Sequence, residues 1–190
     1  MLYTLSNDDL RFAIEFTSQI FAAKEPTSVA LGVTSDEFTD VFQNIMEKSV
    51  WSGYSYASHS EHGDAVALNL PYDQFLEVEY NVIDKIEPMF ALFDAMKYTP
   101  TGKCLYVFSF ASDGRGLASQ LLQHTIDEAR KEGFESILAD CTNIKSQKLF
   151  EKHGFVTRSE VTYGGFEHKG VHLFKNVNTT RSITKMELIL

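Results

Sequence analysis

The chain has 190 residues, which is long enough to bury a sizeable core, and we expect residues 1–190 to form one domain. Its formal net charge of −9 argues against nucleic acid as a partner, because nucleic-acid binding needs a cationic surface. No apolar run approaches the length that crosses a bilayer, and the N-terminus carries Asp8 and Asp9 without a basic flank, so neither a membrane span nor a signal peptide is predicted.

Charge and cysteine usage add two expectations. The first hundred residues hold 16 acidic and 5 basic side chains, whereas the last ninety hold 10 and 12. This asymmetry suits a cationic partner such as an amine, and an acidic solvated face explains it equally well. Cys104 and Cys141 stand in apolar strand contexts and do not make a disulfide framework, which favours a reducing cytoplasm.

In the N-terminal half, cap signals and hydrophobic spacing predict the elements. Ser6 and Asp9 have the spacing of a helix cap, Thr34 and Ser35 begin a second helix, and Pro26 should end the first. The predicted elements are a strand at 2–5, helices from 6 to about 22 and from 35, strands at 51–59 and 64–70 around a turn at 61–63, and a helix at 79–97 that Pro88 kinks or restarts.

In the C-terminal half, strands and helices alternate. The predicted elements are strands at 105–110, 136–141, 156–161 and 183–190, and helices at about 115–132 and 144–152. The strands before and after the helix at 115–132 should be parallel neighbours joined by a right-handed crossover. Alternation along the first of these strands should send Tyr106, Phe108 and Phe110 to one face. A mixed sheet with helices on both faces is the expected architecture.

A glycine-rich turn, Asp113-Gly114-Arg115-Gly116, joins the strand at 105–110 to the helix that follows. The first amides of any helix lack internal partners, and the helix dipole adds positive charge there. A strand, a glycine-rich turn and a helix N-terminus make an anion site suited to a diphosphate. A tight connection that binds nothing has the same pattern, so the turn alone does not decide.

The residues that follow are more specific. Gly116 and Ala118 match the second half of the turn Arg/Gln-x-x-Gly-x-Gly/Ala. A later segment matches Asn-x-x-Ala-x-x-Leu-Tyr-Glu-Lys-x-Gly-Phe at Asn143, Leu149, Glu151, Lys152, Gly154 and Phe155. Residues 103–160 thus resemble the acetyl-CoA-binding half of the GCN5-related N-acetyltransferase (GNAT) superfamily.

This resemblance implies an α/β (α+β) GNAT fold, with a mixed, mostly antiparallel central sheet of about six to seven strands and helices on both faces. It implies acetyl-CoA as the cofactor and an amine as the acceptor. Dimers are frequent in the superfamily, so a homodimer is one expected state, although no segment shows an interface. Asp113, Phe150 and Ser146 depart from the pattern: they replace an Arg/Gln, a Tyr that often protonates the departing thiolate, and an Ala.

The resemblance also implies the cofactor site. The expected diphosphate ligands are the backbone amides of Gly114, Arg115, Gly116, Leu117, Ala118 and Ser119. The strand Tyr106–Phe110 should pair with the pantetheine arm and offer a backbone N–H to the thioester oxygen, with core packing as the alternative for Phe108 or Phe110. Asn143 either bonds the cofactor or caps the helix at 144–152, and Phe150 is expected to contact the cofactor. Ser146 is either a hydroxyl near the thiol or a solvent-facing serine.

A second motif concerns catalysis. Phe21-Ala22-Ala23-Lys24-Glu25-Pro26, followed by Leu31-Gly32, is similar to the Phe-x-x-x-Glu-Pro segment of insect-type arylalkylamine N-acetyltransferases. That similarity implies that Glu25 is the base, acting through water, which an amine with a pKa of about 10 needs at neutral pH. A surface-loop acid is the alternative reading of Glu25.

The predicted activity is acetyl-CoA-dependent acetylation of a small amine, an arylalkylamine or polyamine, by direct attack. Two alternatives stay open: a degenerate acyl-CoA-binding regulatory module, or an enzyme that acetylates proteins or peptides. The histidines form no set with cysteine or carboxylate, so no metal site is predicted.

Overall fold

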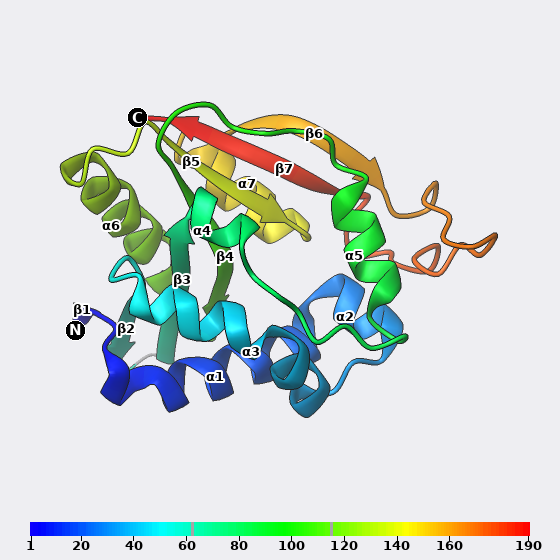
Figure 1. Cartoon of the computed structure of the whole chain (residues 1–190), viewed down its shortest axis with the longest axis horizontal. Helices are drawn as coiled ribbons and strands as arrows, with labels where there is room; N and C mark the ends of the chain where they lie inside the picture. Colours follow the sequence, from blue (N-terminus) through cyan, green and yellow to red (C-terminus); the bar gives the residue numbers. More distant parts are fainter. Residues whose placement is uncertain (62, 115) are drawn as a thin grey trace.

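The computed structural model describes residues 1–61, 63–114 and 116–190. A seven-stranded sheet forms its centre, with strand order β1-β2-β3-β4-β5-β7-β6 (Figure 1). Within the described part of the chain, β4 and β5 pair in parallel and the other neighbouring strands pair antiparallel. The predicted fold class, a mixed and mostly antiparallel sheet of six to seven strands, is confirmed.

The element bounds follow the chain. The strands are β1 (Leu2–Thr4), β2 (Tyr56–Ser60), β3 (Gly63–Pro71), β4 (Cys104–Ser112), β5 (Ser136–Cys141), β6 (Val156–Thr162) and β7 (Ser182–Ile189). The helices are a 3₁₀ turn (Asn7–Asp9), α1 (Leu10–Lys24), α2 (Pro26–Leu31), α3 (Ser35–Trp51), α4 (Tyr72–Leu76), α5 (Glu87–Asp94), α6 (Leu117–Lys131) and α7 (Ile144–Lys152). No helix in the described ranges is both long and apolar enough to cross a bilayer.

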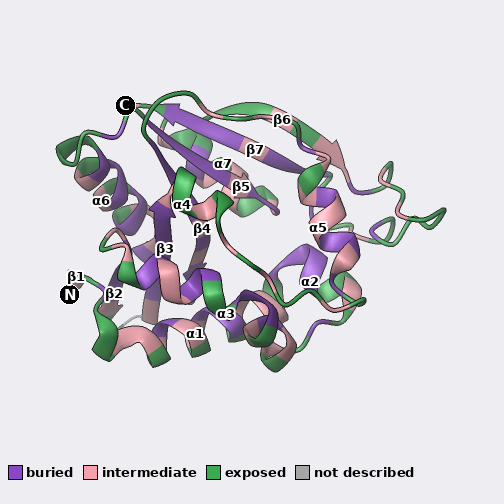
Figure 2. Cartoon of the chain, viewed as in Figure 1, coloured by how far each residue is buried: buried purple, intermediate pink, exposed green. Residues whose placement is uncertain are grey.

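Helices cover both faces of the sheet, and the strands between them are the most buried part of the molecule (Figure 2). On one face, α1 and α3 pack against alternate strand residues, among them Val66 and Leu68 of β3. On the other face, α6 and α7 pack against Leu105 of β4 and Ile137 of β5. The sheet therefore separates two apolar clusters, and a side chain's position along a strand decides which cluster it joins.

The predicted caps are confirmed. Ser6 and Asp9 form a reciprocal capping box at the start of the first helical segment. Thr34 and Glu37 form a second one at α3. Pro26 occupies the first turn of α2, where its missing N–H costs nothing. Helix α1 ends just before Glu25, as expected.

Two predicted elements are wrong in part. The strand expected from Trp51 begins only at Tyr56, because the helical spacing of α3 continues through buried Val50 and carries Trp51 with it. The helix expected at 79–97 is limited to α5, and residues 78–83 have no regular structure. Pro88 lies in the first turn of α5, so the helix restarts there rather than kinks.

Candidate functional site

The central feature of the site is the divergence of β4 and β5. The two strands pair only from Cys104 to Val107 and from Ser136 to Ala139. Beyond that point β4 continues to Ser112 without a strand partner on this edge among the described residues. A cavity of about 640 Å³ opens where they separate. Unpaired backbone groups thus face a space that an extended ligand can enter.

A β-bulge in β4 sets the directions of its aromatic side chains. Leu68 pairs with Ser109 and Asn69 with Val107, so Phe108 is an extra residue on β4. Tyr106 and Phe108 pack on the α1–α3 side of the sheet, whereas Phe110 packs on the α6–α7 side. The expectation that all three share one face is wrong for Phe110, because the extra residue reverses the alternation. All three side chains nevertheless line the cavity.

Helix α6 begins without a side-chain cap. Its N-cap residue is Gly116, which has a left-handed φ of 77° and open space where a Cβ would stand. The amides of Leu117, Ala118 and Ser119 therefore begin a helix whose N-cap residue offers no side-chain hydrogen bond, unlike those of α2, α3 and α7. Such an N-terminus is suited to an anion. The predicted contribution of Arg115 lies outside the described residues.

Asp113 is turned toward the β2–β3 hairpin. Its Oδ1 accepts a hydrogen bond of 2.7 Å from the backbone N–H of Asp64, and its own N–H donates to the Asp64 carbonyl at 3.1 Å. The carboxylate therefore bonds to the first residues of β3 and does not cap α6. Asp113, which stands at the family's Arg/Gln position, is therefore held by hydrogen bonds to β3.

At the start of α7, Asn143 is the N-cap. Its Oδ1 accepts from the amides of Lys145 and Ser146 at 3.0 and 2.9 Å, and the Ser146 hydroxyl donates to the Asn143 carbonyl at 2.8 Å. The helix-cap alternative for Asn143 is therefore what the structure shows. Both residues also line the cavity, so Ser146 is not simply solvent-facing.

Phe150, which follows in α7, takes the family's Tyr position without a hydroxyl. It is 2% exposed, and its ring packs edge-to-face on Phe155 at a centroid distance of 4.8 Å and on Phe110 at 6.0 Å. It lines the cavity as an apolar surface. No proton can come from this side chain.

Glu25 lies in the cavity wall and is 6% exposed. It is the N-cap of α2: its carboxylate accepts from the Thr27 and Ser28 amides at 2.9 and 2.6 Å and from the Thr27 hydroxyl at 2.6 Å. The alternative of a surface-loop acid is therefore wrong. A carboxylate offers about four acceptor sites, so room remains for one further donor, such as a water.

Sequence reasoning missed a buried polar group in the same cavity. The Tyr106 hydroxyl donates to Asp140 Oδ2 at 2.8 Å, and Lys185 Nζ lies 3.7 Å from Asp140 Oδ1. Burial raises the pKa of Asp140, while Lys185 and the Tyr106 hydrogen bond oppose that rise. Burial also raises the pKa of Tyr106. The available signal was the acid itself, which stands between apolar residues in the second half of β5.

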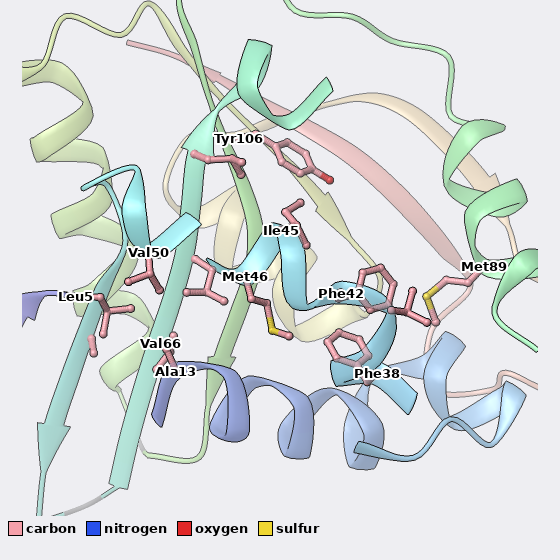
Figure 3. Packing of buried hydrophobic residues seen from close by; sticks show 14 of the residues in the cluster. Leu5, Ala13, Phe38, Phe42, Ile45, Met46, Val50, Val66, Met89 and Tyr106 are labelled. Atoms are coloured by element: carbon pink, nitrogen blue, oxygen red, sulfur yellow. The ribbon is translucent and has the colours of Figure 1, made fainter. Parts of the chain in front are cut away.

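Aromatic side chains make up much of the remaining wall. They come from α1, α3, α4, α5 and the segment before α5: Phe21, Phe38, Phe42, Tyr72, Phe75, Tyr80, Phe90 and Phe93. Figure 3 shows Phe38 and Phe42 of α3, Met89 of α5 and Tyr106 of β4 on the same side of the sheet. Phe75 packs on Tyr106 with a centroid distance of 4.1 Å. The cavity thus offers flat apolar surfaces beside a few polar groups.

Comparison with known proteins agrees with this geometry. Residues 92–155 match the model of the acetyltransferase (GNAT) family. Arylalkylamine N-acetyltransferase 2 from Aedes aegypti is 20% identical with a TM-score of 0.80, and the match covers 100% of this chain and 98% of that one. The C-terminal condensation domain of Ebony, solved with β-alanyl-dopamine, is 16% identical with a TM-score of 0.82 and the same coverages.

A third structure is the Drosophila melanogaster polyamine N-acetyltransferase that catalyses the formation of N-acetylagmatine. It is 16% identical with a TM-score of 0.75, and the match covers 100% of this chain and 99% of that one. At these identities the likeness establishes the fold. The family match over residues 92–155 and the fold shared over the whole chain identify the protein as a GNAT-fold chain that resembles the arylalkylamine N-acetyltransferases.

Proposed function

We propose that the protein is an acetyl-CoA-dependent N-acetyltransferase that acts on a small arylalkylamine by direct attack. The observation that carries this proposal is the cavity at the β4–β5 divergence. It brings together an unpaired strand edge, a buried carboxylate and a wall of aromatic side chains. The family match and the fold support the same reading.

The residues present fit the cofactor. The uncapped N-terminus of α6 suits a diphosphate, and the unpaired β4 edge from Phe108 to Ser112 runs from the cavity to that turn. The amides of Gly114, Gly116, Leu117, Ala118 and Ser119 are the proposed diphosphate ligands. When bound, acetyl-CoA would supply an acetyl group activated as a thioester.

Glu25 is the proposed base. Only about 0.1% of an alkylamine is neutral near pH 7, so attack requires removal of a proton. The Glu25 carboxylate lies in the cavity wall and has room to accept from a water that in turn contacts the amine. Phe150 carries no proton, and a thiol with a pKa near 8.5 leaves readily enough without one.

The wall favours an aromatic acceptor over a polyamine. Aromatic rings offer edge and face contacts to an aryl group. Lys24, Lys97 and Lys185 line the cavity together with Glu25, Asp94 and Asp140, so the charges of the lining are balanced and the aromatic wall decides the preference. Of the three similar structures, one is named for arylalkylamines, one was solved with β-alanyl-dopamine and one is a polyamine N-acetyltransferase, so the choice between the acceptors rests on the cavity wall.

Two measurements test the proposal. Isothermal titration with CoA should give a saturable heat, and the absence of heat at about millimolar CoA would favour a protein that does not use the cofactor. A thiol-release assay should then show turnover with arylalkylamines and less turnover with polyamines of equal length. Release with a peptide N-terminus but with no free amine would support the peptide-modifying alternative instead.

A further inference from the structure

Tyr106, Asp140 and Lys185 form a polar cluster in the wall of the cavity. Asp140 on β5 and Lys185 on β7 are direct cross-strand partners. The Tyr106 hydroxyl fixes one oxygen of the carboxylate, Oδ2, at 2.8 Å. The side chains of Asp140 and Lys185 are only 6% and 12% exposed, and all three residues line the cavity. A buried charge pair in this cavity is weak evidence for a stabilising role, because replacing such pairs by apolar side chains is often neutral or stabilising.

The Asp140–Lys185 pair does not use all of its hydrogen-bonding groups. At 3.7 Å, the contact between Lys185 Nζ and Asp140 Oδ1 is longer than a hydrogen bond. Oδ1 is buried and has no hydrogen-bond partner within the described part of the chain. The ammonium has a counter-ion, yet it keeps N–H donors for another group. Buried polar groups without partners are uncommon, and in a cavity they indicate where a ligand bonds.

We infer that Lys185 donates a hydrogen bond to a neutral oxygen of the acceptor, a hydroxyl on its aromatic ring, and that Asp140 and Tyr106 position Lys185 for that contact. This inference rests on the proposed function. Lys185 and Asp140 together carry no net charge, so neither a second ammonium nor a carboxylate gains a net electrostatic advantage from the pair. The oxygen of a hydroxyl can accept a hydrogen bond from the Lys185 ammonium without adding charge, and its O–H can donate to Asp140. Phe75, which packs against Tyr106 in a tilted arrangement, provides apolar contact for the aromatic ring of the acceptor.

The test compares tyramine with phenethylamine, which differ by one phenolic hydroxyl. The wild-type protein should prefer tyramine in kcat/KM by about 10- to 100-fold, because the hydroxyl bonds a charged donor that phenethylamine leaves without a partner. Lys185→Met should reduce this ratio to about one, mainly by raising KM for tyramine. Lys131→Met, at the exposed end of α6 outside the cavity lining, should keep the wild-type ratio.

A merely structural role of Lys185 gives a different result. In that case Lys185→Met would lower kcat for both amines alike and leave their ratio unchanged, which would overturn the inference. Because this variant leaves Asp140 without its counter-ion, Asp140→Asn/Lys185→Met removes both charges and should show the same loss of preference. Equal wild-type activity on the two amines would contradict the inference but leave the proposed function intact. Absence of thiol release with any amine would contradict the proposed function.

Discussion

At the scale of single residues, Glu25 illustrates how one side chain serves both folding and chemistry. Its carboxylate caps α2 through two backbone amides and lies in the wall of the cavity. The Glu-Pro pair explains both properties, because Pro26 starts a helix that needs a cap and the cap is directed inward. Mutation of Glu25 therefore mixes a stability effect with a catalytic one.

The variant Glu25→Gln separates these effects. It keeps one oxygen that can accept from an α2 amide, loses the cap bond of the other oxygen and removes the basic group, so kcat/KM with an arylalkylamine should fall by about 10²- to 10⁴-fold in protein that remains folded. Thr34→Ala is the matched control, since Thr34 caps α3 outside the cavity lining. It should cost about 1 kcal/mol of stability and leave kcat/KM unchanged. An unaltered kcat/KM for Glu25→Gln between about pH 6 and pH 9 would rule out Glu25 as the base.

At the scale of elements, local signals determined what could be predicted. The bounds of β5 and α7 agree with prediction, because Gly133, Asn143 and Gly154 mark the ends of these segments directly. The sequence pattern predicts a strand from Trp51, but the burial of Val50 in α3 shows that helical packing decides the place of Trp51. Propensity is a weak guide where tertiary contacts compete with it.

Other features depend on contacts between distant segments and leave no local signal. The bulge at Phe108 arises from the register of β4 against β3, so strict alternation misplaced Phe110. The Asp140–Lys185 pair joins residues 45 positions apart through the β5–β7 register. The role of Glu25 and the cofactor ligands came from family resemblance and stay predictions.

The β2–β3 hairpin supports the glycine turn, and Gly63 is the point of contact. Its φ is 120°, and an added Cβ would lie 2.5 Å from Asp113 Oδ1 and 2.8 Å from Gly114 Cα. Gly63→Ala should therefore displace residues 113–114 and raise the Kd for CoA by at least about tenfold, as titration calorimetry would measure.

The control for this variant is Gly53→Ala. Gly53 also has a positive φ, 79°, but an added Cβ there meets nothing within 4 Å. It should lose about 1 kcal/mol of stability through backbone strain and bind CoA as the wild type does. If both variants bind CoA equally well, the hairpin does not hold the turn in place.

At the scale of the whole molecule, one sheet serves as a wall of the two largest apolar clusters. Val66 and Tyr106 belong to the cluster under α1 and α3, whereas Leu105 and Val107 of the same region belong to the cluster under α6 and α7. Neither cluster can be exposed without disturbing strands that the other requires. We therefore expect residues 1–190 to unfold as one cooperative unit.

The two cysteines report on this cooperativity, because each belongs to a different cluster. Cys104 lies on the α1–α3 side and Cys141 on the α6–α7 side, and both are free and buried. Burial raises the pKa of Cys104 to about 11 and also raises the pKa of Cys141, so at about pH 8 almost no thiolate is present in the folded protein. Labelling by a disulfide reagent should therefore require unfolding.

The single-cysteine variants Cys104→Ser and Cys141→Ser test this expectation. Each should label its remaining thiol at the same slow rate, and that rate should rise with urea in parallel with global unfolding. Two different rates in native buffer would show that the two faces open separately, and fast labelling of Cys141 alone would show that the reagent enters through the cavity, which Cys141 lines.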